Sequence, residues 1–260
     1  MTKELNAIFT IAFRDVTKLL RDRVRLIASL IFPLIFIGVL GGGLNQSFGE
    51  RLGYSYLTFI FTGVLAQVLF SSTASGVIFL LEDRENDFSK ELFVAPVSPY
   101  SIIFGKIFGE SLVAVTQGVA IVLFSVLLGV RFTLLQIVWL VPIALACTLL
   151  GGAFGFLVLA NLNTQRRANQ IFPFLIFPQF FLSGAFNPAR DFPWYLTILS
   201  TITPLAYGVD LLRGVFYRGT SEFSEVVIRS PIVNLLFIAF LFTLFIIIGT
   251  ALFVKNERER

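Results

Sequence analysis

The chain has 260 residues, of which 56% are hydrophobic and only 14% are charged, and its formal net charge is +4. A soluble domain of ordinary composition carries roughly 25% charged residues, so this composition excludes the ordinary soluble class and indicates an integral membrane protein. The chain has a single cysteine and no histidine. An intrachain disulfide is therefore excluded, and no metal ligand set and no cofactor are expected in this chain.

The first segment, residues 3–24, has the pattern of an amphipathic helix. Apolar residues recur at three- and four-residue spacing while basic residues fall between them. The apolar positions are Leu5, Ile8, Phe9, Ala12, Val16, Leu19 and Leu20. Such a helix lies in the membrane interface, either as a plain anchor or along the cytoplasmic surface in contact with a soluble partner. The apolar run that follows is too long for a signal-peptide core, so we expect it to be retained as a first span.

Six apolar runs are long enough to cross a membrane, because a spanning helix needs about 20 mostly apolar residues. We expect spans at about residues 26–45, 57–81, 106–129, 133–160, 169–187 and 232–254. With both termini in the cytoplasm, most lysines and arginines lie on the cytoplasmic side, as the positive-inside rule requires. If residues 192–209 also spanned the membrane, the same bias would result, so charge does not decide between these topologies.

The most charged segment, residues 82–100, lies between the second and third predicted spans. Its charged residues precede an apolar stretch that ends at prolines, which predicts a short docked helix; a solvated charged loop is the alternative. The candidate contact residues are Glu82, Asp83, Arg84, Glu85, Lys90, Glu91, Leu92, Phe93 and Pro96.

Residues 188–216 separate the fifth and sixth predicted spans. The segment is short for a span and is interrupted by Pro193 and Pro204. It also carries aromatic residues of the types favoured at the membrane interface, Trp194, Tyr195 and Tyr207. We interpret it as a re-entrant or interfacial helical hairpin on the outer side, which either serves a transport pathway or acts as a packed cap. The predicted fold is thus an all-α integral membrane protein with six transmembrane helices.

Two local ion pairs are predicted from spacing. Glu110 is the main charged residue within the predicted spans, and it lies four residues after Lys106 at the start of the third span. The simplest role for it is an ion pair with Lys106 at the membrane boundary. Asp210 and Arg213 are three residues apart in the outer hairpin.

Two motifs make the chain similar to a known family. The charged cluster is followed by "LFVAPVS" and then by "GK" at the third span, and residues 178–216 carry "LSGAFNP", a Pro-Trp helix and "PLAYGVDLLR". Their order resembles the permease subunits of the ABC-2 family of ATP-driven exporters over nearly the whole chain. The resemblance implies that residues 82–100 form a cytoplasmic coupling helix seated in a nucleotide-binding subunit, with residues 3–24 as a connector helix beside it. It also implies that two permeases, identical or related, form the pathway at their interface.

The chain shows no ATPase motif. It lacks the G-x-x-x-x-G-K-[ST] loop that holds phosphates, since Gly105 and Lys106 are followed by Ile107. ATP and Mg²⁺ are therefore expected in a separate soluble P-loop ATPase subunit, and the chain itself is not expected to be an enzyme. The expected location is the plasma or inner membrane of a bacterium or archaeon, with membrane lipid and no nucleic acid as partners.

Substrate contacts are expected within the membrane. The candidate pathway residues are Gln67, Ser71, Ser72, Phe177, Phe181, Pro204 and Tyr207. Small polar residues in membrane helices also serve close packing, which is the alternative role for the serines. Aromatic and aliphatic lining favours a drug-like or lipid-like amphiphile moved outward. Polysaccharide, teichoic-acid or oligosaccharide precursors, which related permeases handle, are the alternative substrates.

Two rival functions come from other classes. A secondary transporter driven by an ion gradient usually needs an acidic residue near the bilayer midplane and often two repeated halves, and the sequence shows neither. A purely structural membrane scaffold is the other rival, but it would not explain why residues 82–91 carry so many charges.

Overall fold

The computed structural model describes residues 2–44, 53–81, 98–162 and 164–258, and the regular elements in these ranges are all helices. Five stretches are long and apolar enough to cross a membrane: Leu26–Gly43, Tyr56–Ile78, Tyr100–Leu127, Leu134–Ala160 and Phe223–Asn256. They occupy the positions of five of the six predicted spans. The prediction of an all-α membrane fold is confirmed to this extent.

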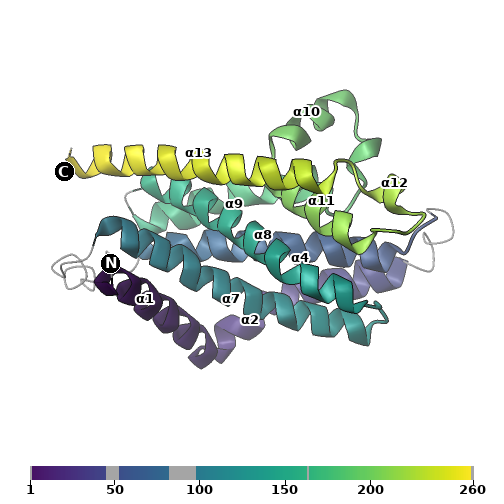
Figure 1. The fold of residues 1–260 in the computed structure, drawn as a ribbon, viewed down its shortest axis with the longest axis horizontal. Coiled ribbons are helices and arrows are strands. Elements are labelled where there is room, and N and C mark those ends of the chain that lie inside the picture. Colours follow the sequence, from purple (N-terminus) through teal and green to yellow (C-terminus); the bar gives the residue numbers. More distant parts are fainter. Residues whose placement is uncertain (1, 45–52, 82–97, 163, 259–260) are drawn as a thin grey trace.

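The two chain ends lie at the same end of an elongated helical bundle (Figure 1). Helix α1 (Thr2–Arg21) is followed after Asp22 by α2 (Arg23–Ile35), which continues as the π-helix η1 (Phe36–Gly43). Helices α4 (Tyr56–Ile78), α7 (Pro99–Leu127), α8 (Leu134–Ala160) and α13 (Pro231–Arg258) run along the bundle. We call the end where α1 begins and α13 ends the terminal end, and the opposite end the far end.

Helix α4 forms the centre of the bundle. Of its apolar window, 83% is buried, against 17% for the windows on α2 and on α13. Helix α4 packs against α7, α8 and η1. Its contact with α8 is at backbone level, because a Cβ atom added at Gly151 or Gly155 would collide with the carbonyl oxygen of Phe70 or Ala74. Close approach through small residues is how membrane helices associate when lipid removes the hydrophobic driving force between them.

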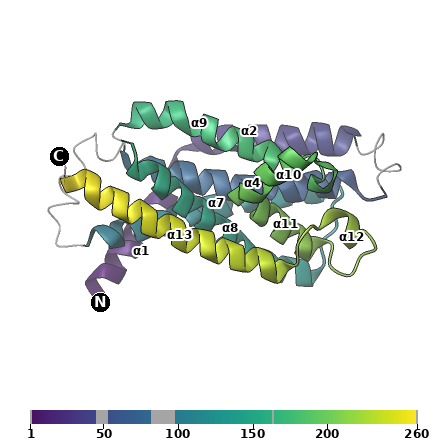
Figure 2. The same cartoon turned by 90° about the horizontal axis from the view of Figure 1, so that it is seen from above.

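Helix α9 (Gln165–Leu182) lies beside α2 along one side of the bundle (Figure 2). It occupies the position of the predicted fifth span, yet it is not among the five candidates. Its first turns carry polar residues, Arg166, Arg167, Asn169 and Gln170, so its apolar part is short.

The predicted outer hairpin forms helices at the far end: η2 (Ala189–Asp191), α10 (Trp194–Ile202) and α11 (Pro204–Phe216), with the short α12 (Phe223–Val226) after them. Helices α10 and α11 would count as a sixth span if they were a single helix, but they are bent by 90° at Thr203. Such a bend occurs in a broken span as well as in a re-entrant hairpin. Whether α9 or this pair supplies the sixth span stays a prediction.

Replacing Gly151 with Ala tests the close packing of α4 and α8. The new methyl group would meet the backbone of Phe70, which cannot rotate away, so the helices must separate. We expect the free energy of unfolding in detergent to fall by about 1–3 kcal/mol, the usual cost of overpacking. Gly42→Ala is the matched control, because nothing lies within 4 Å of the added atom there, and it should leave stability unchanged or slightly raised. Equal effects of both substitutions would contradict the packing argument.

Candidate functional site

A groove of about 350 Å³ lies between α2, α4 and α7. Phe32, Val68 and Phe79 give it apolar walls, while several amide and hydroxyl side chains face the same space. These polar residues are Ser29, Gln67, Ser71, Ser72, Ser75 and Gln117. The groove is therefore amphipathic, and it runs along the second half of α4.

Gln67 is the polar centre of the groove and is only 8% exposed. Its Nε2 donates to Ser71 Oγ at 3.2 Å, whereas its buried Oε1 has no hydrogen-bond partner in the part of the chain that the structure describes. Across the groove, Gln117 Nε2 donates to Ser29 Oγ at 3.0 Å. A buried carbonyl oxygen without a donor is costly, so a donor entering the groove would relieve that cost.

The structure places the predicted pathway residues in three separate regions. Gln67, Ser71 and Ser72 come together in the groove. Phe177 and Phe181 are more than half exposed on the outer face of α9. Phe180, on the same helix, has its ring 6.0 Å from that of the groove residue Phe32. The exposed aromatic face therefore borders the groove without lining it.

Pro204 and Tyr207 are buried inside the outer hairpin and are not among the groove residues. The Tyr207 hydroxyl donates to the Thr201 carbonyl at 2.8 Å, and its ring stacks on that of Phe237 with a centroid distance of 4.9 Å. These contacts join α10, α11 and α13. They give Tyr207 a structural role at the far end.

A buried ion cluster fixes α1 to α7 near the terminal end. Lys106 Nζ lies 3.0 Å from Asp15 Oδ2 and 2.9 Å from Glu110 Oε1, and none of these side chains is more than 5% exposed. The half-buried Arg14 lies 3.2 Å from Asp15 Oδ1. Among the ion pairs of the described residues, two carboxylates thus meet two cations at this place. The predicted pair of Lys106 and Glu110 is present. The contact of Lys106 with Asp15 was not predicted, because residue spacing within one helix gives no information about a partner on another helix.

Glycines provide the room for this cluster. An added Cβ at Gly76 of α4 would collide with the Glu110 carboxylate, and one at Gly109 would lie 2.8 Å from Ala12 Cα. Helices α1, α4 and α7 therefore meet around one set of charges. A further contact joins the starts of α1 and α7, where the Ser98 backbone N–H donates to Glu4 Oε2 at 3.2 Å. The predicted coupling residues, from Glu82 to Pro96, lie outside the described residues.

At the far end, Asp210 and Arg213 contact different partners instead of each other, so their predicted pairing is wrong. The Asp210 carboxylate accepts hydrogen bonds from the backbone N–H groups of Ile228 and Arg229 and from Asn234 Nδ2, each at 2.8 Å. It thereby closes the segment before α13 onto α11. Asp210 therefore reaches its three donors in the segment before α13 and in α13 itself, and Arg213 is not within ion-pair distance of it.

Arg213 joins α11 to α4 and to the turn after α9. Its Nη2 donates to the Ala185 carbonyl at 3.1 Å, and its guanidinium lies 3.7 Å from the centre of the Phe59 ring. Tyr54 and Tyr217 lie nearby, just outside α4 and α11. Burial raises the pKa of both phenols, against the opposing effect of the Arg213 charge. Both phenols therefore stay neutral at physiological pH.

Comparison with known proteins relates the chain to a family of transporters. Residues 6–217, more than half of the chain, match the family described as ABC-2 type transporter. A protein of Cyanophora paradoxa named as a transport permease, ycf38, is 28% identical over 226 residues, which cover 85% of this chain and 78% of that protein. Nodulation protein J of Rhizobium meliloti is 23% identical, with 73% of each chain covered. A protein of Escherichia coli K12 named as a multidrug ABC transporter permease, YbhR, is 24% identical, with 64% of this chain and 45% of that protein covered.

Removing the Lys106 ammonium tests whether the ion cluster holds α1 in place. Lys106→Met leaves two buried carboxylates without their shared cation, so we expect the free energy of unfolding to fall by about 3–5 kcal/mol. The triple variant Asp15→Asn, Lys106→Met and Glu110→Gln removes all three charges together and should recover part of that loss. Chemical denaturation in detergent measures both. A triple variant less stable than Lys106→Met would contradict the role given to the charges.

Proposed function

The chain belongs to the ABC-2 type transporter family, and on this basis we propose that it is the transmembrane permease subunit of an ATP-driven exporter. A separate soluble P-loop subunit would bind ATP and Mg²⁺ and supply the energy. The substrate would be a hydrophobic or amphipathic molecule that leaves the cytoplasm or the inner leaflet. We place the protein in a bacterial or archaeal plasma membrane, with both termini in the cytoplasm.

The observation that carries the substrate class is the amphipathic groove between α2, α4 and α7. Its aromatic and aliphatic walls suit an apolar body, and the unpartnered Gln67 Oε1 suits a hydrogen-bond donor on the same molecule. Among the residues that the structure describes, no Asp, Glu, Lys or Arg lines this groove. A drug-like or lipid-like amphiphile fits these surroundings better than an ion does.

The terminal end of the bundle supports the coupling role. Residues 82–97 follow directly on α4 and precede α7, and both of these helices line the groove. A push on this segment by an ATPase subunit would act on both helices together. The ion cluster joins α1 to the same pair, so the three helices would move as one body. Charged residues at such an interface set orientation and register more than affinity.

A second permease, identical or related, would cover the side of the bundle that α2 and α9 share (Figure 2). This side exposes large apolar side chains, among them Ile27, Ile31, Phe32, Phe174, Phe177 and Phe181. The groove lies directly beside it, since Phe32 belongs to both. Two chains packed through this side would enclose the pathway between them.

Two alternatives are separated from this proposal by experiment. A polysaccharide, teichoic-acid or oligosaccharide precursor, which the family resemblance left open, is the second candidate substrate. Transport of a hydrophilic glycan alone, without ATPase stimulation by amphiphiles, would favour that candidate. A carrier driven by an ion gradient would transport without any ATPase subunit.

Gln67→Leu tests the groove. Loss of the amide removes one hydrogen bond to the substrate, so we expect amphiphile-stimulated ATPase activity of the reconstituted complex to fall by up to about tenfold. Thr116→Val is the control, since Thr116 lies one residue before Gln117 on α7 but bonds only to the Leu112 carbonyl of its own helix. If Gln67→Leu keeps full stimulation, the groove is not the substrate site.

Charge reversal in the coupling segment tests the motor interface. The variant Glu82→Lys, Arg84→Glu and Glu85→Lys should still insert in the membrane but lose transport and ATPase coupling. A reversal at the exposed Glu225, near the far end, should have no such effect. A gradient-driven carrier or a scaffold would respond to neither change, and that result would overturn the coupling role.

A further inference from the structure

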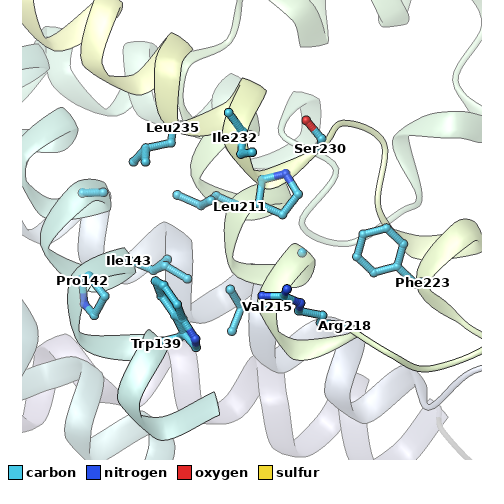
Figure 3. A pocket seen from close by; sticks show the side chains of 13 residues that line it. Trp139, Pro142, Ile143, Leu211, Val215, Arg218, Phe223, Ser230, Ile232 and Leu235 are labelled. Carbon is cyan, nitrogen blue, oxygen red and sulfur yellow. The ribbon is translucent and has the colours of Figure 1, made fainter. Parts of the chain in front are cut away.

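An apolar cavity of about 470 Å³ lies at the far end of the bundle, away from the groove. Figure 3 shows side chains of α8, α11 and α13 around it, with Trp139 on one side and Phe223 on the other. The cavity opens outward, because Trp139 is 46% and Ile232 72% exposed. Helices α8 and α13, which form two of its walls, are long and apolar enough to cross a membrane, so lipid would reach this opening.

One end of the cavity is cationic. Arg218 is the charged residue among its lining side chains and is exposed. In the described part of the chain it makes no ion pair and no side-chain hydrogen bond, and the nearby Glu222 and Glu225 do not pair with it. Ser230 and Pro231 at the start of α13 also line the cavity, but the Asp210 carboxylate accepts hydrogen bonds from the backbone N–H groups just before them, so the positive charge at this end is that of Arg218.

We infer that this cavity holds an anionic phospholipid of the leaflet at the far end, with an acyl chain along Trp139 and Leu211 and the phosphate at Arg218. The charge complementarity carries this choice, because the site combines an apolar interior with one unpaired cation at its edge. Trp139 is near the start of α8, and tryptophan is enriched where membrane helices meet the polar margin of a bilayer. An acyl chain conforms to a concave apolar cavity, whereas a second protein copy would need a matching protrusion.

The inference rests on the membrane fold and not on the ATPase partner. The lipid would be a resident ligand that fills the space between α8, α11 and α13, and the transported molecule would pass elsewhere. Failure of the export proposal would leave this site unaffected. Failure of the lipid site would likewise leave the groove and the coupling segment as they are.

Tryptophan quenching by brominated lipid tests the site without any transport assay. The chain has two tryptophans, so Trp194→Phe leaves Trp139 as the reporter. This parent variant is reconstituted in phosphatidylcholine vesicles that contain a small, equal mole fraction of either brominated phosphatidylglycerol or brominated phosphatidylcholine. We expect the anionic lipid to be enriched about fivefold at Trp139, as judged from its quenching relative to the neutral lipid.

Two variants locate the effect. Arg218→Gln should bring the two lipids to equal quenching, while Arg131→Gln, an exposed arginine before α8 that does not line the cavity, should keep the preference. Ala146→Phe fills the cavity and should weaken quenching by the anionic lipid even with Arg218 present. Because this variant tests volume and not charge, the proposal can be judged even if Arg218→Gln fails to fold.

Three results would overturn the inference. Equal quenching by both lipids in the parent variant would show that the cavity does not select an anionic head group. An equal loss in Arg131→Gln and Arg218→Gln would assign the preference to general surface charge. Unchanged quenching in Ala146→Phe would show that the lipid lies outside the cavity.

Discussion

The arrangement of the terminal end depends on one ammonium group, Lys106 Nζ, held between the carboxylates of Asp15 and Glu110. A charge in a low-dielectric interior is tolerated only when it is paired, so these three side chains must stay together. Because they come from α1 and α7, and because Gly76 of α4 makes room for Glu110, the pairing joins three helices. The N-terminal helix is thereby fixed to the spans instead of resting loosely on the membrane surface. Two of these helices continue into the groove, which gives the cluster a mechanical connection to it.

Charged side chains are also buried at the far end, but their partners there are of a different kind. There the Asp210 carboxylate accepts three hydrogen bonds, whereas Arg213 donates to the Ala185 carbonyl and lies against the Phe59 ring, with no partner for its Nε among the described residues. These contacts close the hairpin onto α4 and α13 and make it a packed element. Between the two ends lies the groove, where the carbonyl oxygen of Gln67 has no partner among the described residues. Other buried polar atoms among the described residues also lack a partner, such as Arg213 Nε and the Tyr217 hydroxyl, but of these atoms Gln67 Oε1 belongs to a residue that lines the groove, where a ligand could satisfy it.

The sequence predicted the spans and the Lys106–Glu110 pair within one helix, but it did not predict the contacts between helices. Length and composition identify α2, α4, α7, α8 and α13 as spans, and the four-residue spacing of Lys106 and Glu110 predicts their pair. Asp15 could not be found in this way, since its partner lies on another helix. In the groove, Gln67 and Ser71 follow from one face of α4, whereas Ser29 and Gln117 depend on how α2 and α7 pack against it. For Arg213 the spacing misled, because Asp210 lies three residues earlier and suggested an ion pair. In the folded chain Arg213 instead contacts the Ala185 carbonyl and the Phe59 ring. The coupling residues between Glu82 and Pro96 lie outside the described residues and stay a prediction.

The central claim is that this membrane chain works with a separate ATPase. The most direct measurement is to crosslink the tagged protein in its native membrane, purify it in mild detergent and identify the accompanying proteins by mass spectrometry. The account predicts a near-stoichiometric soluble protein that carries a P-loop, crosslinked through the segment between α4 and α7. Repeated recovery of the permease without such a protein, despite crosslinking before solubilisation, would contradict the account and favour a carrier driven by an ion gradient.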